Sequence, residues 1–107
     1  MPAFDIEITD LAADELRGIR LYDRRRIVEE IQSQLEDQPT LITKNRKLLE
    51  GAVPDFEHVA PIWELRVSEF RVFYDVDEFA RVVFVRAVRR KRQVQTTEDL
   101  IHERDNR

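Results

Sequence analysis

The first half of the chain alternates or repeats its apolar residues in a way that predicts one strand and two helices. Residues 4–8 alternate strictly between apolar and acidic side chains, which predicts a short half-buried strand. The apolar residues that follow recur at helical spacing, at Ala12, Leu16, Ile19, Ile27, Ile31 and Leu35. Thr9-Asp10 and Asp23 have the composition of helix starts, and Pro39 cannot continue a helix. We therefore expect one helix over about 10–21, and a second that begins near Asp23 and ends before Pro39.

Three runs in the second half are rich in β-forming residues. They cover residues 62–68, 70–76 and 81–88, and the gaps between them are short enough for hairpins. The alternation in the first two runs predicts that Trp63 and Tyr74 project toward the core. Arg71 and Phe73 are then expected on the other face of the sheet. These runs predict a three-stranded antiparallel meander, and the segment 97–104 predicts a short C-terminal helix.

The whole chain, residues 1–107, is expected to form one domain, because its length leaves no room for a second core of normal size. The order of elements is β-α-α-β-β-β, which predicts an α+β fold with a helical hairpin packed on an antiparallel sheet. Residues 40–61 read as a long polar connection between the helices and the meander.

Composition excludes several classes of site. The chain has no cysteine, so disulfides, thiol catalysis and cysteine-ligated metals are excluded. His58 and His102 lie far apart in the sequence, and the two glycines do not form a phosphate-binding loop. No apolar run is long enough to span a membrane, and the N-terminus does not resemble a signal peptide. We expect no cofactor, no metal, no membrane partner and a cytoplasmic location.

The charge is distributed unevenly. The net charge is −4, and residues 1–39 hold most of the acidic excess. A cluster of five basic residues without an intervening acid begins near the end of the third β-rich run and continues past it, at Arg86, Arg89, Arg90, Lys91 and Arg92. The local potential decides where an anion binds, so the cluster is a candidate anion-binding surface despite the acidic total.

Several segments resemble the RelE/ParE family of bacterial toxins. They are Asn45-Arg46-Lys47-Leu48-Leu49, Trp63-Glu64-Leu65-Arg66-Val67, Phe70 to Val76, and Val82 to Val88 with the basic run after it. The resemblance implies a toxin of a type II toxin–antitoxin system that acts on ribosome-bound mRNA, or alternatively one that inhibits DNA gyrase.

The same resemblance implies catalytic residues. Endonucleases of this family use an arginine just after the first turn of the meander, which Arg71 matches, and basic residues after the last strand, which Arg90 and Lys91 match. The family's lysines on the first meander strand would fall near Ile62 and Glu64, and its C-terminal tyrosine has no counterpart. Those differences leave open a gyrase inhibitor, or a protein that only binds an antitoxin.

Cleavage by a neighbouring 2′-hydroxyl requires a base, cations around the phosphate and an acid for the leaving oxygen. We predict a phosphate clamp of Arg71, Arg90 and Lys91, with Glu64 as the one acid on that strand face that could act as the base. The remaining basic residues predicted to contact RNA are Arg46, Lys47, Arg66, Arg86, Arg89 and Arg92. Glu64 could instead form only a cross-strand charge pair. An antitoxin is expected to cover Arg71 and the basic cluster.

Overall fold

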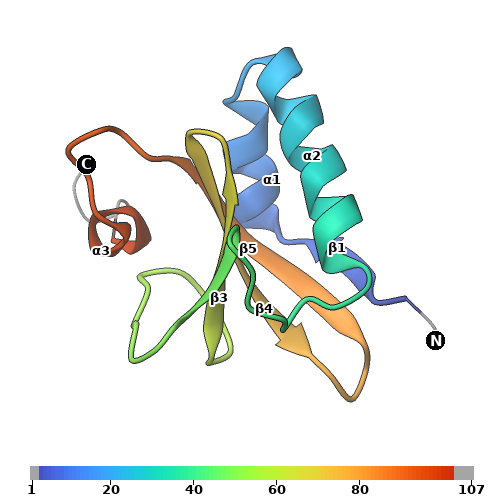
Figure 1. Cartoon of the computed structure of the whole chain (residues 1–107). Helices are drawn as coiled ribbons and strands as arrows, with labels where there is room; N and C mark the ends of the chain where they lie inside the picture. Colours follow the sequence, from blue (N-terminus) through green and yellow to red (C-terminus); the bar gives the residue numbers. More distant parts are fainter. Residues whose placement is uncertain (1–2, 103–107) are drawn as a thin grey trace.

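The computed structural model describes residues 3–102, which form three helices and a five-stranded sheet (Figure 1). The strands are β1 (Asp5–Ile8), β2 (Arg46–Leu49), β3 (Ile62–Val67), β4 (Phe70–Asp77) and β5 (Val82–Arg90). The helices are α1 (Asp10–Arg17), α2 (Leu21–Leu35) and α3 (Thr97–Ile101). The sheet order is β1–β5–β4–β3–β2. The predicted continuation of the last helix to residue 104 lies outside the described residues.

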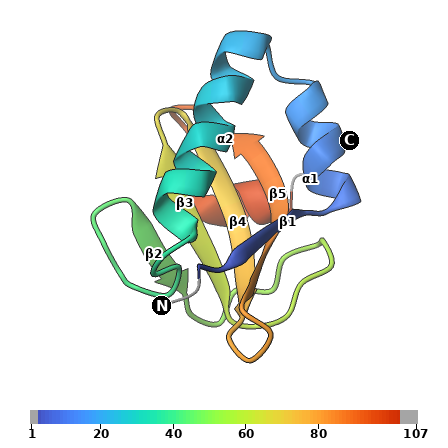
Figure 2. The ribbon, with the colours of Figure 1, turned by 90° about the vertical axis from the view of Figure 1, so that its right-hand side faces the viewer.

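The predicted α+β fold is confirmed, and the structure adds two features to it. β1 pairs with β5 in parallel, so the sheet is mixed, while its other neighbouring strands pair antiparallel. The segment 40–61 contains a further strand, β2, which pairs with β3 and forms one edge of the sheet. In Figure 2, which views the sheet from the side of α1 and α2, β1 and β2 lie toward opposite edges.

Local interactions fix where the first two helices begin and end. The Thr9 side chain accepts a hydrogen bond from the Ala12 amide at 3.3 Å, which caps α1. The Arg24 guanidinium, from the first turns of α2, donates to the carbonyls of Leu16 and Ile19, at 3.0 Å each. A cation at the C-terminal end of α1 also complements the helix dipole. Arg24 therefore joins the two helices of the hairpin.

The sheet separates two apolar cores. α1 and α2 cover one face, and α3 lies on the other side of the sheet (Figure 1). Trp63 and Tyr74 are buried in the first core with their rings stacked, 6.2 Å between centroids, as their alternation predicts. Phe73 is fully buried in the second core together with Leu100 and Ile101 of α3. Phe73 therefore packs beneath the C-terminal helix and does not present its ring to solvent.

Candidate nucleic-acid interface

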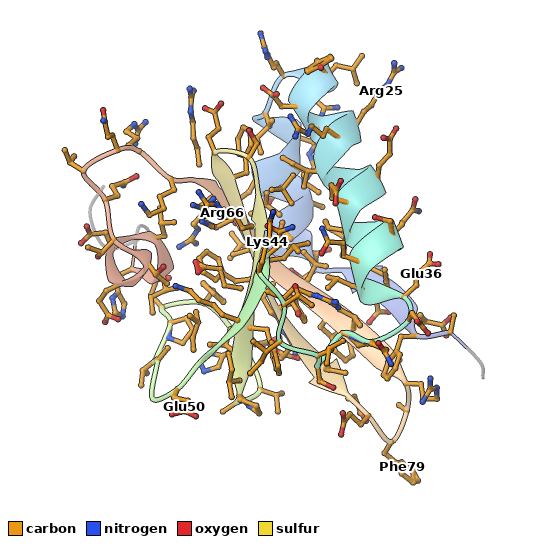
Figure 3. The ribbon with its side chains drawn as sticks, in the orientation of Figure 1. Arg25, Glu36, Lys44, Glu50, Arg66 and Phe79 are labelled. Carbon is orange, nitrogen blue, oxygen red and sulfur yellow. The ribbon has the colours of Figure 1, made fainter. Side chains whose placement is uncertain are left out.

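A basic pocket lies on the face of the sheet that α3 shares. Its volume is about 270 Å³. The residues that line it come from the segment before β2, from β2, β3 and β4, from the residue after β5 and from α3: Lys44, Asn45, Arg46, Lys47, Glu64, Arg66, Arg71, Lys91 and Thr97. Figure 3 shows Lys44 and Arg66 side by side in the middle of the molecule. Six of these nine side chains are basic and one is acidic.

Strand register brings the charged side chains of the pocket together. Lys47 of β2 is opposite Glu64 of β3, and Arg66 of β3 is opposite Arg71 of β4. Directly opposed residues project to the same face of a sheet, and residues two apart along a strand share a face. Lys47, Glu64, Arg66 and Arg71 therefore line one face, as the alternation predicts for β3 and β4.

Glu64 lies buried at the base of the pocket, with 3% of its surface exposed. The Thr97 hydroxyl lies 2.9 Å from its Oε2 and 3.3 Å from its Oε1 and donates to the carboxylate. Lys47 Nζ is 3.5 Å from Oε1, and Arg71 Nε is 3.9 Å from Oε2. The cross-strand charge pair is therefore present. The Glu64 carboxylate is held by two cations and one hydroxyl. Glu64 thus places a single negative charge among the basic side chains of the pocket.

Arg71 is half-buried and is held by the turn between β3 and β4. Its Nη1 donates to the carbonyls of Ser68 and Phe70, both at 2.9 Å. Burial lowers the pKa of Arg71 from its usual value, nearby Glu64 raises it and Arg66 lowers it. A guanidinium stays protonated under such influences, so Arg71 presents a fixed positive charge in the pocket.

Arg46 lines the pocket but is itself largely buried, with 8% of its surface exposed. Its Nη1 donates to the carbonyls of Gln34 and Gln38 at the C-terminal end of α2, at 2.7 and 2.6 Å. Arg46 was predicted to contact RNA, and in the structure its guanidinium satisfies carbonyl groups at the end of the helix. Lys47, the next residue, is exposed.

The basic run from Arg86 to Arg92 is not one surface. Arg86 is buried and forms an ion pair with Asp75, with Arg86 Nε 2.7 Å from Asp75 Oδ2. Arg89 is buried and pairs with Glu15 of α1, with Arg89 Nε 2.8 Å from Glu15 Oε2. Both were predicted to contact RNA. In the structure their charges are balanced inside the protein by these acidic partners.

The end of β5 separates Arg90 from Lys91. Lys91 lines the pocket, as predicted. Arg90 lines a different hollow, with Gly18, Ile19 and Phe70, and pairs with Glu69. Phe70 belongs to the core beneath α1 and α2, so Arg90 lies toward the opposite face of the sheet from Arg71. Of the three residues predicted to form the clamp, Arg71 and Lys91 line the pocket and Arg90 does not. Arg92 is exposed and does not line the pocket.

Sequence patterns did not predict three residues of the pocket. Lys44 and Asn45 precede β2 in a segment without clear periodicity, and Thr97 begins α3. The basic composition of residues 44–47 was a signal for the first two. The position of Thr97 depends on how α3 folds back over the sheet, which no local pattern encodes.

The pocket is suited to bind an anion. Lys44, Lys47, Arg66, Arg71 and Lys91 surround it, and among them Arg71 is held in place by the carbonyls of Ser68 and Phe70. Cations from separate strands can contact several oxygens of one phosphate group. Within residues 3–102, His, Asp and Glu side chains form no group that could hold a metal ion.

Comparison with known protein families shows which family the chain belongs to. The model of a family described as the ParE toxin of type II toxin–antitoxin systems (parDE) matches residues 6–95. The chain belongs to this ParE toxin family. The match covers the helical hairpin, the sheet except Asp5, and every residue of the pocket except Thr97. No curated protein sequence matches the chain.

Solved toxin structures share the fold of this ParE-family chain. The RelBE2 toxin–antitoxin complex of Mycobacterium tuberculosis matches with a TM-score of 0.67 at 19% identity, covering 85% of this chain and all of that one. The RelE–RelB complex of Pyrococcus horikoshii matches with a TM-score of 0.66 at 21% identity, over 85% and 98% of the two chains. A mutant of Escherichia coli RelE in the free state matches with a TM-score of 0.57 at 26% identity, over 87% of each. No helix within residues 3–102 is both long and apolar enough to cross a membrane.

Proposed function

We propose that this toxin is a metal-independent endoribonuclease that cleaves mRNA on the ribosome and thereby inhibits translation in the cytoplasm. The observation that carries the proposal is the pocket, in which five cations from the stretch around β2, from β3 and β4 and from the residue after β5 surround one buried carboxylate. A pocket of about 270 Å³ lined in this way suits a phosphodiester and its ribose. RelE-like structures share the fold, which is consistent with this activity.

The proposed reaction assigns roles to the pocket residues. Glu64 removes the proton from the 2′-hydroxyl, whose oxygen attacks the adjacent phosphorus and displaces the 5′-oxygen. Arg71 and Lys47 stabilise the negative charge that develops on the phosphorane oxygens. Lys91 supplies the proton that the leaving 5′-oxygen takes up. The products are a 2′,3′-cyclic phosphate and a free 5′-hydroxyl, so protons and bonds balance without a metal.

Inhibition of DNA gyrase is the second candidate. The family whose model matches is the ParE family, and the resemblance to RelE/ParE toxins includes gyrase inhibitors. The charge of Glu64 also partly neutralises the centre of the pocket, where an endonuclease would hold a phosphate. A gyrase inhibitor needs neither a base nor a phosphate clamp, and it would tolerate this arrangement.

One pair of assays separates the two candidates. The purified toxin is added to a cell-free translation reaction programmed with finished mRNA, and mRNA ends are mapped by primer extension with and without ribosomes. We expect new ends that depend on both toxin and ribosomes. The same preparation is added to a gyrase supercoiling assay. Intact mRNA together with inhibited supercoiling would overturn the endonuclease proposal in favour of the second candidate.

We also propose that an antitoxin neutralises the chain by covering the pocket. The M. tuberculosis and P. horikoshii relatives are described as complexes of toxin with antitoxin. An acidic antitoxin segment would complement the exposed cations Lys44 and Arg66 and the half-buried Lys91. Substituting Arg66 and Lys91 by alanine should weaken antitoxin binding, whereas Arg90→Ala, on the other face, should leave it unchanged. Equal affinity for all these variants would place the antitoxin elsewhere.

A further inference from the structure

A groove continues from the pocket toward α2. Asn45 and Arg66 line both the pocket and the groove, which has a volume of about 180 Å³. Val67 and Ser68 extend its wall on the side of β3. The opposite wall is α2, which contributes a row of residues at four-residue spacing: Arg26, Glu30 and Gln34. Arg66 is therefore shared between the proposed active pocket and a second, continuous depression.

A hollow beside α2, distinct from the one that Arg90 lines, extends the same row toward the start of the helix. It has a volume of about 540 Å³ and is lined by Leu21, Tyr22, Arg25, Arg26 and Glu29. Arg26 borders both this hollow and the groove. Tyr22 lies four residues before Arg26, and residues at that spacing neighbour each other on a helix surface. Its side chain is 69% exposed, and the Arg20 guanidinium lies 5.8 Å from its ring centroid.

The charges along this row favour an anionic ligand. Within residues 3–102, neither Arg26 nor Arg66 forms an ion pair or a side-chain hydrogen bond. Arg25 is exposed and projects from the N-terminal half of α2 (Figure 3). Two acids lie along the row, Glu29 and Glu30, and Glu30 Oε2 accepts a hydrogen bond from Gln34 Nε2 at 2.7 Å.

We propose that the groove and the hollow form a track for single-stranded RNA that extends outward from the pocket. Arg66 and Arg26 contact successive phosphates, and the exposed ring of Tyr22 stacks on a base beyond them. Positively charged grooves with aromatic platforms are the usual means of binding single strands without sequence preference. The inference rests on the proposed function, because it assumes that the pocket binds an RNA phosphate.

The aromatic ring at the end of the track favours RNA over an acidic peptide. A carboxylate-rich peptide would interact with Arg25, Arg26 and Arg66, and Tyr22 would add little to its binding. A nucleobase stacks on an exposed tyrosine and gains affinity from that contact. The two ligands therefore differ in how strongly their binding depends on Tyr22.

Binding of non-cleavable oligoribonucleotides of two lengths tests the track. The RNAs carry 2′-O-methyl groups, and their affinities are measured by fluorescence anisotropy for a trinucleotide and for a strand of about nine nucleotides, which is within the usual site size. We expect Tyr22→Ala and Arg26→Ala to weaken binding of the longer strand about tenfold, which corresponds to about 1.4 kcal/mol, and to leave the trinucleotide unaffected. Arg71→Ala should weaken both. Arg17→Ala removes an exposed arginine of α1 that pairs with Asp14, and it is the matched control.

The outcomes separate failure of the track from failure of the proposed function. If Arg71→Ala weakens both RNAs and the α2 variants weaken neither, the pocket binds RNA and the track is overturned. If wild-type toxin binds neither RNA, the proposed function fails together with the track. If Arg26→Ala weakens binding of an acidic antitoxin peptide but not of the longer RNA, the row is a protein-binding surface and the RNA track is overturned.

Discussion

The Thr97 hydroxyl donates to the carboxylate of Glu64, with Oγ1 2.9 Å from Oε2. This hydrogen bond connects the first residue of α3 to the centre of β3, 33 positions earlier in the chain. It completes the pocket, because Thr97 is the residue of α3 that lines it. The proposed base therefore depends for its orientation on the packing of the C-terminal helix.

Removing the Thr97 hydroxyl should destabilise the protein. Thr97→Val leaves a buried carboxylate with one donor fewer, and a buried polar group that loses its partner costs about 1–3 kcal/mol. Urea denaturation would measure the difference, with Thr97→Ser as the matched control that keeps the hydroxyl. Equal unfolding free energies for the two variants would show that the hydrogen bond contributes nothing to stability.

Glu64→Gln should change RNA binding and RNA cleavage in opposite directions. The variant keeps the shape of the side chain and removes a negative charge from the pocket, so affinity for a non-cleavable RNA should rise about three- to tenfold. Cleavage should slow by about 10²–10⁴-fold, because the amide cannot accept the 2′-hydroxyl proton. Anisotropy and single-turnover kinetics measure the two effects. Undiminished cleavage would exclude Glu64 as the base.

Arg89→Ala should lower the free energy of unfolding. Arg89 is 3% exposed, and its removal takes away a cation that pairs with Glu15 and with the partly buried Asp55. Breaking a buried ion pair from one side costs about 3–5 kcal/mol. Arg92→Ala, an exposed change in the same basic run, should stay within about 0.5 kcal/mol of wild type in denaturant unfolding. A stable Arg89→Ala variant with weakened RNA binding would restore the role predicted from sequence.

His102 should make a pH-dependent contribution to stability. A hydrogen bond to the carbonyl of Val53, helped by nearby Glu98, raises the pKa of His102. A raised pKa favours the protonated form in the folded protein, so the stabilisation is complete below the unfolded value of about 6.5 and is lost as pH rises through the folded pKa. NMR titration of the ring should give a pKa above 6.5, and Glu98→Gln should lower it. A value at or below 6.5 would refute this.

The order of most elements followed from the sequence because their patterns are local. Alternation in residues 62–76 correctly placed Trp63 and Tyr74 in the core, and Pro39 correctly lay beyond the end of α2. β2 was missed because four residues with two basic side chains show no clear alternation. The parallel pairing of β1 with β5 joins segments more than 70 residues apart, and it depends on the path of the whole chain.

The pocket was predictable only where residues lie on one strand face. Alternation assigned Glu64, Arg66 and Arg71 to a shared face, and the register confirms it. The basic run after β5 looked uniform in sequence, but its members lie in different environments. Arg89 finds acidic partners contributed by α1 and by the loop after β2, and those partners are distant in sequence.

Single-turnover cleavage of mRNA on programmed ribosomes tests the central claim most directly, with Arg71→Ala, Lys91→Ala and Arg90→Ala compared with wild type. We predict that wild type cleaves, that Arg71→Ala slows cleavage by about 10²–10³-fold through loss of transition-state charge stabilisation, and that Lys91→Ala is also impaired. Arg90→Ala, which pairs with Glu69 away from the pocket, should cleave normally. Arg71→Lys should retain part of the rate if the loss reflects charge, not folding. Absence of cleavage by wild type, or equal rates for Arg71→Ala and Arg90→Ala, would contradict the account.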